Sequence, residues 1–185
     1  MEESSYGKDI AVDARLADGS YGGKDVEGYE IDPELSNRLR TVYYNKDGDA
    51  VVSLRGTELK DKRWWDELGT NALIATGLQD YSSRIKNDIN TTNKAKEKYK
   101  NVRVVGHSQG GSRAVAVGHK TGTQGVAFDP AFSPVDLFRN RTYTNTKAYR
   151  TVNDLVSGLA PSIRSLSTTS IKAKKRNAHS LKNFL

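Results

Sequence analysis

The sequence contains no cysteine, which excludes disulfide bonds, thiolate metal sites and a cysteine nucleophile. It also lacks any apolar run of the roughly 20 residues that a membrane-spanning helix needs. The first residues, MEESSYGKDI, are acidic and polar and do not resemble a secretory signal. No histidines and carboxylates follow metal-ligand spacing, so we expect neither a metal nor an organic cofactor. These absences predict an intracellular, cytoplasmic protein without a transmembrane segment.

Basic residues outnumber acidic ones, 29 to 22, which gives a formal net charge of +7. An excess of this size serves solubility, and it also favours anionic partners such as phospholipid headgroups. The basic run at residues 172–176 (KAKKR) is as typical of a solvated loop as of a phosphate-binding or nuclear-targeting segment. We therefore expect, at most, peripheral contact with an anionic membrane surface, and nucleic acid is not an expected partner.

The length suits a single domain, residues 1–185, with residues 1–8 as a flexible tail. Strand-like and helix-like segments alternate along the chain, which predicts an α/β fold with a mostly parallel sheet covered by helices. The predicted strands are residues 39–44, 50–54, 102–105, 124–128 and 147–152, and the predicted helices are residues 9–16, 82–100, 112–119 and one that begins at Asp32. Residues 157–177, rich in Ser, Thr and Lys, are expected to be loop.

One stretch dominates the functional reading of the chain, residues 102–111 (VRVVGHSQGG). A β-branched run leads into Gly-His-Ser-Gln-Gly, and a segment of small and apolar residues follows. This is a G-x-S-x-G motif between a strand and a helix, the setting of a nucleophilic serine. Glycines belong on both sides because strand and helix nearly touch there. Ser108 is therefore the candidate nucleophile.

Two acidic residues follow predicted strands, Asp129 and Asp154, and both remain candidates to orient a catalytic imidazole. Of the three histidines, His179 alone follows both acids. His107 lies within the serine turn, where its side chain is expected to point away from Ser108. The order Ser, Asp, His along the chain is that of an α/β-hydrolase.

Four stretches together resemble the fungal-type, or class 3, lipase family of α/β-hydrolases. They are VVSLRGTE (residues 51–58), GHSQGG (106–111), YRTVNDLVSGL (149–159) and AHSLKNFL (178–185). The resemblance implies a Ser108–His179–Asp154 triad, with Asp129 as the alternative acid. It also implies an oxyanion hole formed by the Thr57 and Gln109 amides.

The resemblance further implies hydrolysis of carboxylic esters, chiefly lipid esters, through an acyl-enzyme. The only candidate for a lid over the site is residues 58–66, so we expect the lid to be short or absent. Trp64, Trp65 and His107 belong either to the core or to a substrate wall. The alternative is a catalytically silent hydrolase-fold module that binds an acidic surface, either anionic lipid or nucleic acid.

Overall fold

The computed structural model describes residues 3–56, 78–132, 143, 145–158, 160–163, 165–174 and 177–185. These residues form one seven-stranded sheet whose strands lie side by side in chain order. The strands are β1 (Glu30–Ile31), β2 (Arg40–Tyr44), β3 (Asp49–Leu54), β4 (Asn101–His107), β5 (Gln124–Phe128), β6 (Thr146–Thr151) and β7 (Ser167–Ile171). The two pairings among β1, β2 and β3 are antiparallel, and all pairings from β3 to β7 are parallel. The expected α/β fold with a mostly parallel sheet is confirmed.

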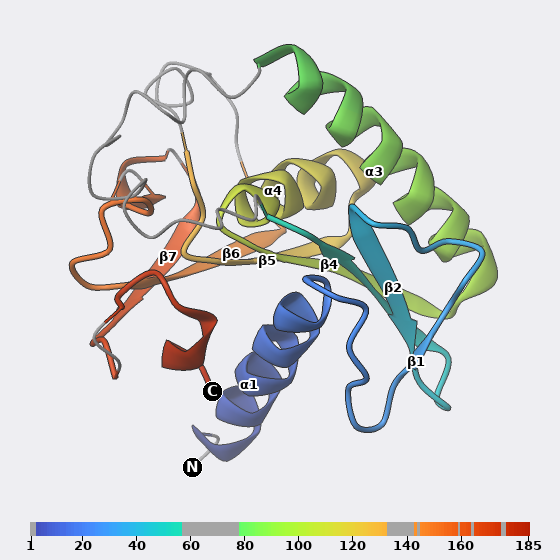
Figure 1. Ribbon diagram of the computed structural model, residues 1–185, viewed down its shortest axis with the longest axis horizontal. Coiled ribbons are helices and arrows are strands. Elements are labelled where there is room, and N and C mark those ends of the chain that lie inside the picture. Colours follow the sequence, from blue (N-terminus) through green and yellow to red (C-terminus); the bar gives the residue numbers. More distant parts are fainter. Residues whose placement is uncertain are drawn as a thin grey trace.

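Helices cover both faces of this sheet (Figure 1). The helix α1 (Glu3–Gly19) lies on one face, and α3 (Leu78–Lys98) and α4 (Gln109–Thr121) lie on the other. Side chains alternate along the strands accordingly: Val51 and Val105 pack in the core on the α1 side, and Val52 and Val104 pack in the core on the α3 and α4 side. Strands buried on both faces explain the continuous β-branched runs in the sequence.

The amino-terminal part differs from the sequence prediction in two places. The helix α1 begins at Glu3, whereas residues 1–8 were expected to be a flexible tail and the helix to span residues 9–16. No helix follows Asp32, because the chain makes a turn at residues 33–35 and a second at 38–39 before it enters β2. In the first turn the Asp32 carboxylate accepts the N–H groups of Glu34 and Leu35. The residues typical of a helix start therefore cap a turn instead.

The segment expected to be loop, residues 157–177, contains the 3₁₀ helix η1 (Ala160–Ser162) and the strand β7. As the last strand of the sheet, β7 pairs only with β6 among the described strands. Most of its side chains are exposed, so the strand does not need alternating apolar residues. Its Ser and Thr residues therefore did not indicate a strand in the sequence. Among the described residues, no helix combines the length and apolar character that crossing a bilayer requires.

Because strands β3 to β7 are parallel, the residues that follow them meet at one edge of the sheet. Arg55 and Gly56 follow β3, Ser108 follows β4, Asp129 follows β5, and Asp154 comes shortly after β6. The fold thus gathers the candidate residues at its carboxyl edge.

Candidate active site

Ser108 occupies the sharp turn between β4 and α4. Its backbone angles, φ 57° and ψ −125°, lie in a region that residues other than glycine rarely adopt. Its N–H donates to the Phe128 carbonyl at 3.0 Å, and its own carbonyl accepts the N–H of Ala131 at 3.0 Å. Hydrogen bonds to the end of β5 and to the segment after it thus hold this strained residue in place, as expected where strain serves a site.

The two glycines around Ser108 are required by close packing. A Cβ on Gly106 would collide with the Gly110 carbonyl, and a Cβ on Gly110 would collide with the main chain of Leu54 at the end of β3. The expectation that strand and helix nearly touch beside the serine is therefore confirmed by the geometry.

Asp154 and His179 form a hydrogen-bonded pair, with His179 Nδ1 at 3.0 Å from Asp154 Oδ2. The Asp154 carboxylate also accepts the N–H of Ser157 at 3.0 Å. Burial alone would raise the pKa of Asp154, but the His179 contact and the Ser157 hydrogen bonds outweigh it and keep this pKa below its ordinary value. An ionised Asp154 can hold the His179 ring with its proton on Nδ1.

Asp129, the alternative acid, is fully buried and makes other contacts. Its carboxylate accepts the N–H of Thr151 at 2.6 Å and the Thr151 hydroxyl at 3.1 Å. Burial raises the pKa of Asp129 to about 6, against the lowering effect of the Thr151 N–H. Of the two acids that the sequence left open, the structure joins Asp154 to the imidazole and uses Asp129 to fix the end of β6.

The segment that carries His179 is anchored to the core despite its place near the last residue. Asn183, in the 3₁₀ helix η2 (Leu181–Asn183), is fully buried and donates to the carbonyls of Asn177 and Ala178, at 3.0 Å each. The Phe184 ring packs edge-on against Phe128 at 5.0 Å between centroids. His179 is therefore held by packing and hydrogen bonds rather than carried on a loose end.

His107, expected to belong to the core or to a substrate wall, is buried and lies beside His179. Its ring centroid lies 4.6 Å from that of His179, and its Nδ1 lies 3.0 Å from the Tyr21 hydroxyl. Burial, followed by the charge of His179, holds the pKa of His107 well below its ordinary value, so the ring is neutral. Tyr21 gave no signal in the sequence, because it lies in a Gly- and Asp-rich stretch far from every motif.

The segment after β3 lies directly beside the serine turn. A Cβ on Gly56 would come within 3.4 Å of Ser108 Cβ and 2.7 Å of the His107 carbonyl. The buried Arg113 of α4 donates to the Arg55 carbonyl at 2.5 Å and to the Asp88 carboxylate at 2.7 Å, which ties this segment to α3 and α4.

Gln109 is the first residue of α4, so its amide belongs to the helix N-terminus beside Ser108. Four of the sequence-based expectations lie outside the described residues: Thr57 as an oxyanion donor, Trp64 and Trp65 as core or substrate wall, and the short or absent lid at residues 58–66.

Within the described residues, no hydrogen bond joins the Ser108 hydroxyl to the His179 imidazole. In ligand-free enzymes such contacts are often long and tighten only when substrate binds. His107, Asp129 and His179 also place possible metal-ligating atoms within 4.8 Å of one another. The hydrogen bonds of these histidines to Tyr21 and Asp154 both use Nδ1, so Nε2 of each ring is the atom that could bind a metal without breaking them.

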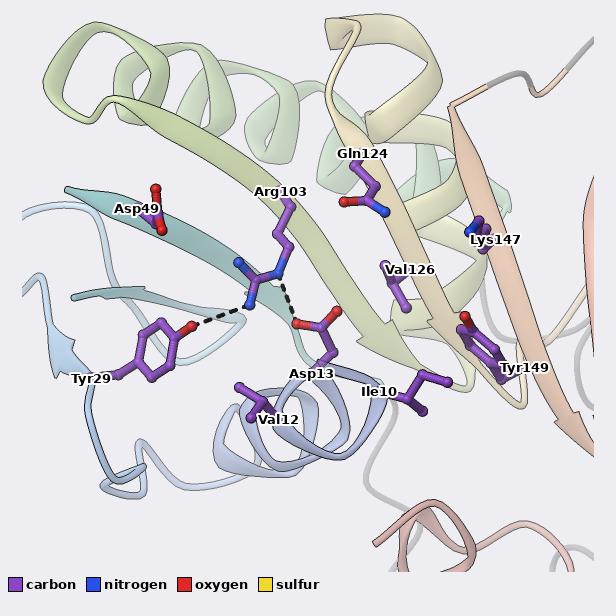
Figure 2. Close-up of a pocket in the computed structure, with 10 residues that line it drawn as sticks. All are labelled: Ile10, Val12, Asp13, Tyr29, Asp49, Arg103, Gln124, Val126, Lys147 and Tyr149. Atoms are coloured by element: carbon purple, nitrogen blue, oxygen red, sulfur yellow. Dashed lines mark hydrogen bonds and ion pairs between the residues drawn. The ribbon is translucent and has the colours of Figure 1, made fainter. Parts of the chain in front are cut away.

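A separate pocket of about 440 Å³ lies between α1 and the sheet (Figure 2). Arg103 of β4 spans it, donating to Asp13 at 2.8 Å and to the Tyr29 hydroxyl at 3.3 Å. Arg103 is five residues before Ser108 along an extended strand, a separation of roughly 16 Å. The pocket is therefore remote from the serine, and its central cation is already paired with an acid.

No protein-family model matches this chain, and no curated protein matches it either. What the site can do is therefore inferred from its own residues.

Proposed function

We propose that this protein is a serine hydrolase that cleaves carboxylic esters through an acyl-enzyme on Ser108, within an α/β-hydrolase fold. The observation that carries the proposal is the Asp154–His179 hydrogen bond at the sheet edge that bears the strained Ser108 turn. A strained serine and an acid-oriented imidazole are two of the parts that nucleophilic acyl transfer needs. The resemblance of four sequence stretches to class 3 lipases supports the same conclusion.

In the proposed reaction, His179 Nε2 accepts the Ser108 hydroxyl proton while Oγ attacks the ester carbonyl. Asp154 keeps the ring in the tautomer that leaves Nε2 able to accept, and it stabilises the imidazolium that forms. The carbonyl oxygen becomes an oxyanion, for which the Gln109 and Thr57 amides are the proposed donors. One such donor is typically worth about 10²–10³ in rate.

The tetrahedral intermediate collapses when His179 returns its proton to the departing alcohol, leaving an acyl group on Ser108. Water then attacks this ester with His179 again as base, which releases the carboxylic acid and restores the hydroxyl. No step needs an oxidant, a metal or an organic cofactor.

Lipid esters are the proposed substrate class. The formal charge of +7 favours an anionic interface, so we propose anionic phospholipid vesicles as the surface on which the enzyme works. Trp64 and Trp65 are proposed to contact the acyl chain.

The test is hydrolysis of p-nitrophenyl butyrate by the wild type and by Ser108→Ala. We expect the variant to lose at least about a thousandfold in kcat/KM, because no other residue of the proposed site supplies the nucleophile. Ser167→Ala is the matched control, since Ser167 is an exposed residue of β7. Equal hydrolysis by Ser108→Ala and the wild type would end the proposal. A wild type that hydrolyses no ester would also end it and would leave the silent binding module.

A further inference from the structure

We propose that Tyr21 and His107 are positioning residues that hold the His179 imidazole and the segment after β3 in a fixed relation around Ser108. The inference rests on the proposed function. It assigns a role to a residue of the amino-terminal segment, which lies outside every stretch that suggested the activity.

Tyr21 contacts both the residue that precedes Ser108 and the segment after β3. Its hydroxyl lies 3.0 Å from His107 Nδ1, and the two rings meet edge to face with centroids 6.0 Å apart. A Cβ on Gly56 would collide with the same hydroxyl, so the segment after β3 packs directly on it. The Arg55 guanidinium lies 5.9 Å from the centre of the Tyr21 ring. One phenol therefore joins the segment after β3 to the imidazole next to the nucleophile.

Both partners of the Tyr21–His107 hydrogen bond are uncharged. Burial raises the pKa of Tyr21 far above its ordinary value, against the lowering effect of a Gly56 main-chain hydrogen bond, so the phenol keeps its proton. His107 is neutral because burial disfavours its charged form. Because the phenol oxygen already takes part in the Gly56 main-chain hydrogen bond, the Tyr21 hydroxyl is proposed to direct its own proton to His107 Nδ1, which puts the single ring proton of His107 on Nε2.

The neutral His107 ring matters because it packs on His179, with 38° between the ring planes. During acyl transfer His179 becomes an imidazolium, and a second cation at 4.6 Å between centroids would oppose that charge. The groups that act on His107 are the Tyr21 hydroxyl, the His179 ring and main chain, and the Asp154 carboxylate. The Asp129 carboxylate also lies within 4.8 Å of a His107 ring nitrogen. A His107 ring fixed by Tyr21 gives His179 a neutral, rigid neighbour.

The tautomer can be read directly, because the chain has only three histidines. We would record long-range ¹H–¹⁵N imidazole spectra of the full chain from pH 5 to 8, with His107→Gln to assign the signal. In the wild type we expect His107 to stay neutral with its proton on Nε2. In Tyr21→Phe, Nδ1 loses its donor, and we expect the Nδ1–H tautomer to become populated.

The matched control is Tyr44→Phe. In the wild type the Tyr44 hydroxyl donates to Glu30 at 2.6 Å and forms no hydrogen bond with His107. This variant should leave the His107 signal unchanged. The rate of fluorophosphonate labelling at Ser108 should fall about ten- to a hundredfold in Tyr21→Phe, as for a misplaced catalytic group, and stay at the wild-type rate in Tyr44→Phe.

An unchanged His107 tautomer and an unchanged labelling rate in Tyr21→Phe would overturn this inference while leaving the proposed function intact. A wild type that does not label at Ser108 would overturn the proposed function, and with it the catalytic purpose given to Tyr21. The spectra would still decide whether the Tyr21–His107 hydrogen bond sets the tautomer.

Discussion

At the scale of single residues, the choice between two acids can be tested by substitution. Asp154→Asn should lower kcat for ester hydrolysis by about 10⁴, because the amide can leave the His179 proton on the wrong nitrogen. Asp129→Asn should lower it far less, since the Asp129 carboxylate contacts Thr151 rather than His179. Steady-state kinetics on a soluble ester measures both. A larger loss in Asp129→Asn than in Asp154→Asn would reverse the assignment.

Asp129 should also leave a signature in the pH dependence of stability. Burial raises its pKa from 3.8 to about 6, so the folded state holds its proton more tightly than the unfolded state does. The stabilisation is therefore present at low pH and is lost as the pH rises through 6. Between pH 5 and 8 this loss amounts to about 1.4 kcal/mol.

Asp129→Asn should remove that loss, because an amide does not ionise. Urea unfolding of both proteins at pH 5 and pH 8 gives the four free energies of unfolding needed. Asp154 does not affect the comparison, because its pKa lies below 3.8 and it therefore stays ionised between pH 5 and 8. Identical slopes in the two proteins would show that Asp129 does not titrate in this window.

The sequence predicted which residue types the serine turn requires, but it did not predict which side chains form hydrogen bonds with one another. The Gly106 and Gly110 requirement followed from the motif, because close backbone contact is a local property of the turn. Asp129 and Asp154 could not be separated, since both follow strands and only tertiary hydrogen bonds distinguish them. Tyr21 was missed for the same reason, because it reaches His107 across 86 positions of the chain.

At the scale of elements, buried segments were predicted well and edge segments were not. β3, β4 and β5 carry continuous apolar runs because both faces of the central sheet are covered, and most residues of α4 are buried as well. The strand β7 and the two-residue strand β1 lie at the sheet edges, where pairing to a neighbour replaces apolar burial. The first turns of α1 were expected to be a tail because Glu3 and the polar residues after it show no apolar stripe.

The carboxyl-terminal element should be sensitive at Asn183. Asn183→Ala removes hydrogen bonds to the Asn177 and Ala178 carbonyls and to the Lys174 N–H, just beside His179. We expect a loss of about 1–3 kcal/mol in the free energy of unfolding, because buried main-chain groups are left without partners. The kcat for ester hydrolysis should fall as well, measured at a temperature where the variant remains folded.

Asn93→Ala is a suitable control, because this residue is exposed on α3. Asn183→Ala with wild-type stability and kcat would mean that His179 does not depend on this anchor.

At the scale of the whole molecule, the excess of basic residues should govern where the enzyme works. A net charge of +7 should draw the protein to anionic phospholipid vesicles, and added salt should weaken that attraction because exposed charges are screened within about 8 Å at physiological ionic strength. Vesicle co-sedimentation of Ser108→Ala measures binding without turnover. Equal binding to anionic and zwitterionic vesicles at low salt would remove the anionic surface from the proposal.

The central claim is that Ser108 is an activated nucleophile, and covalent labelling tests it most directly. A fluorophosphonate should attach to the wild type within residues 104–113, the tryptic peptide that contains Ser108 and Ser112. Fragment ions should place the adduct on Ser108, and labelling should disappear in Ser108→Ala and slow strongly in His179→Gln. A folded wild type that takes no label at Ser108, or that labels equally fast without His179, would contradict the claim.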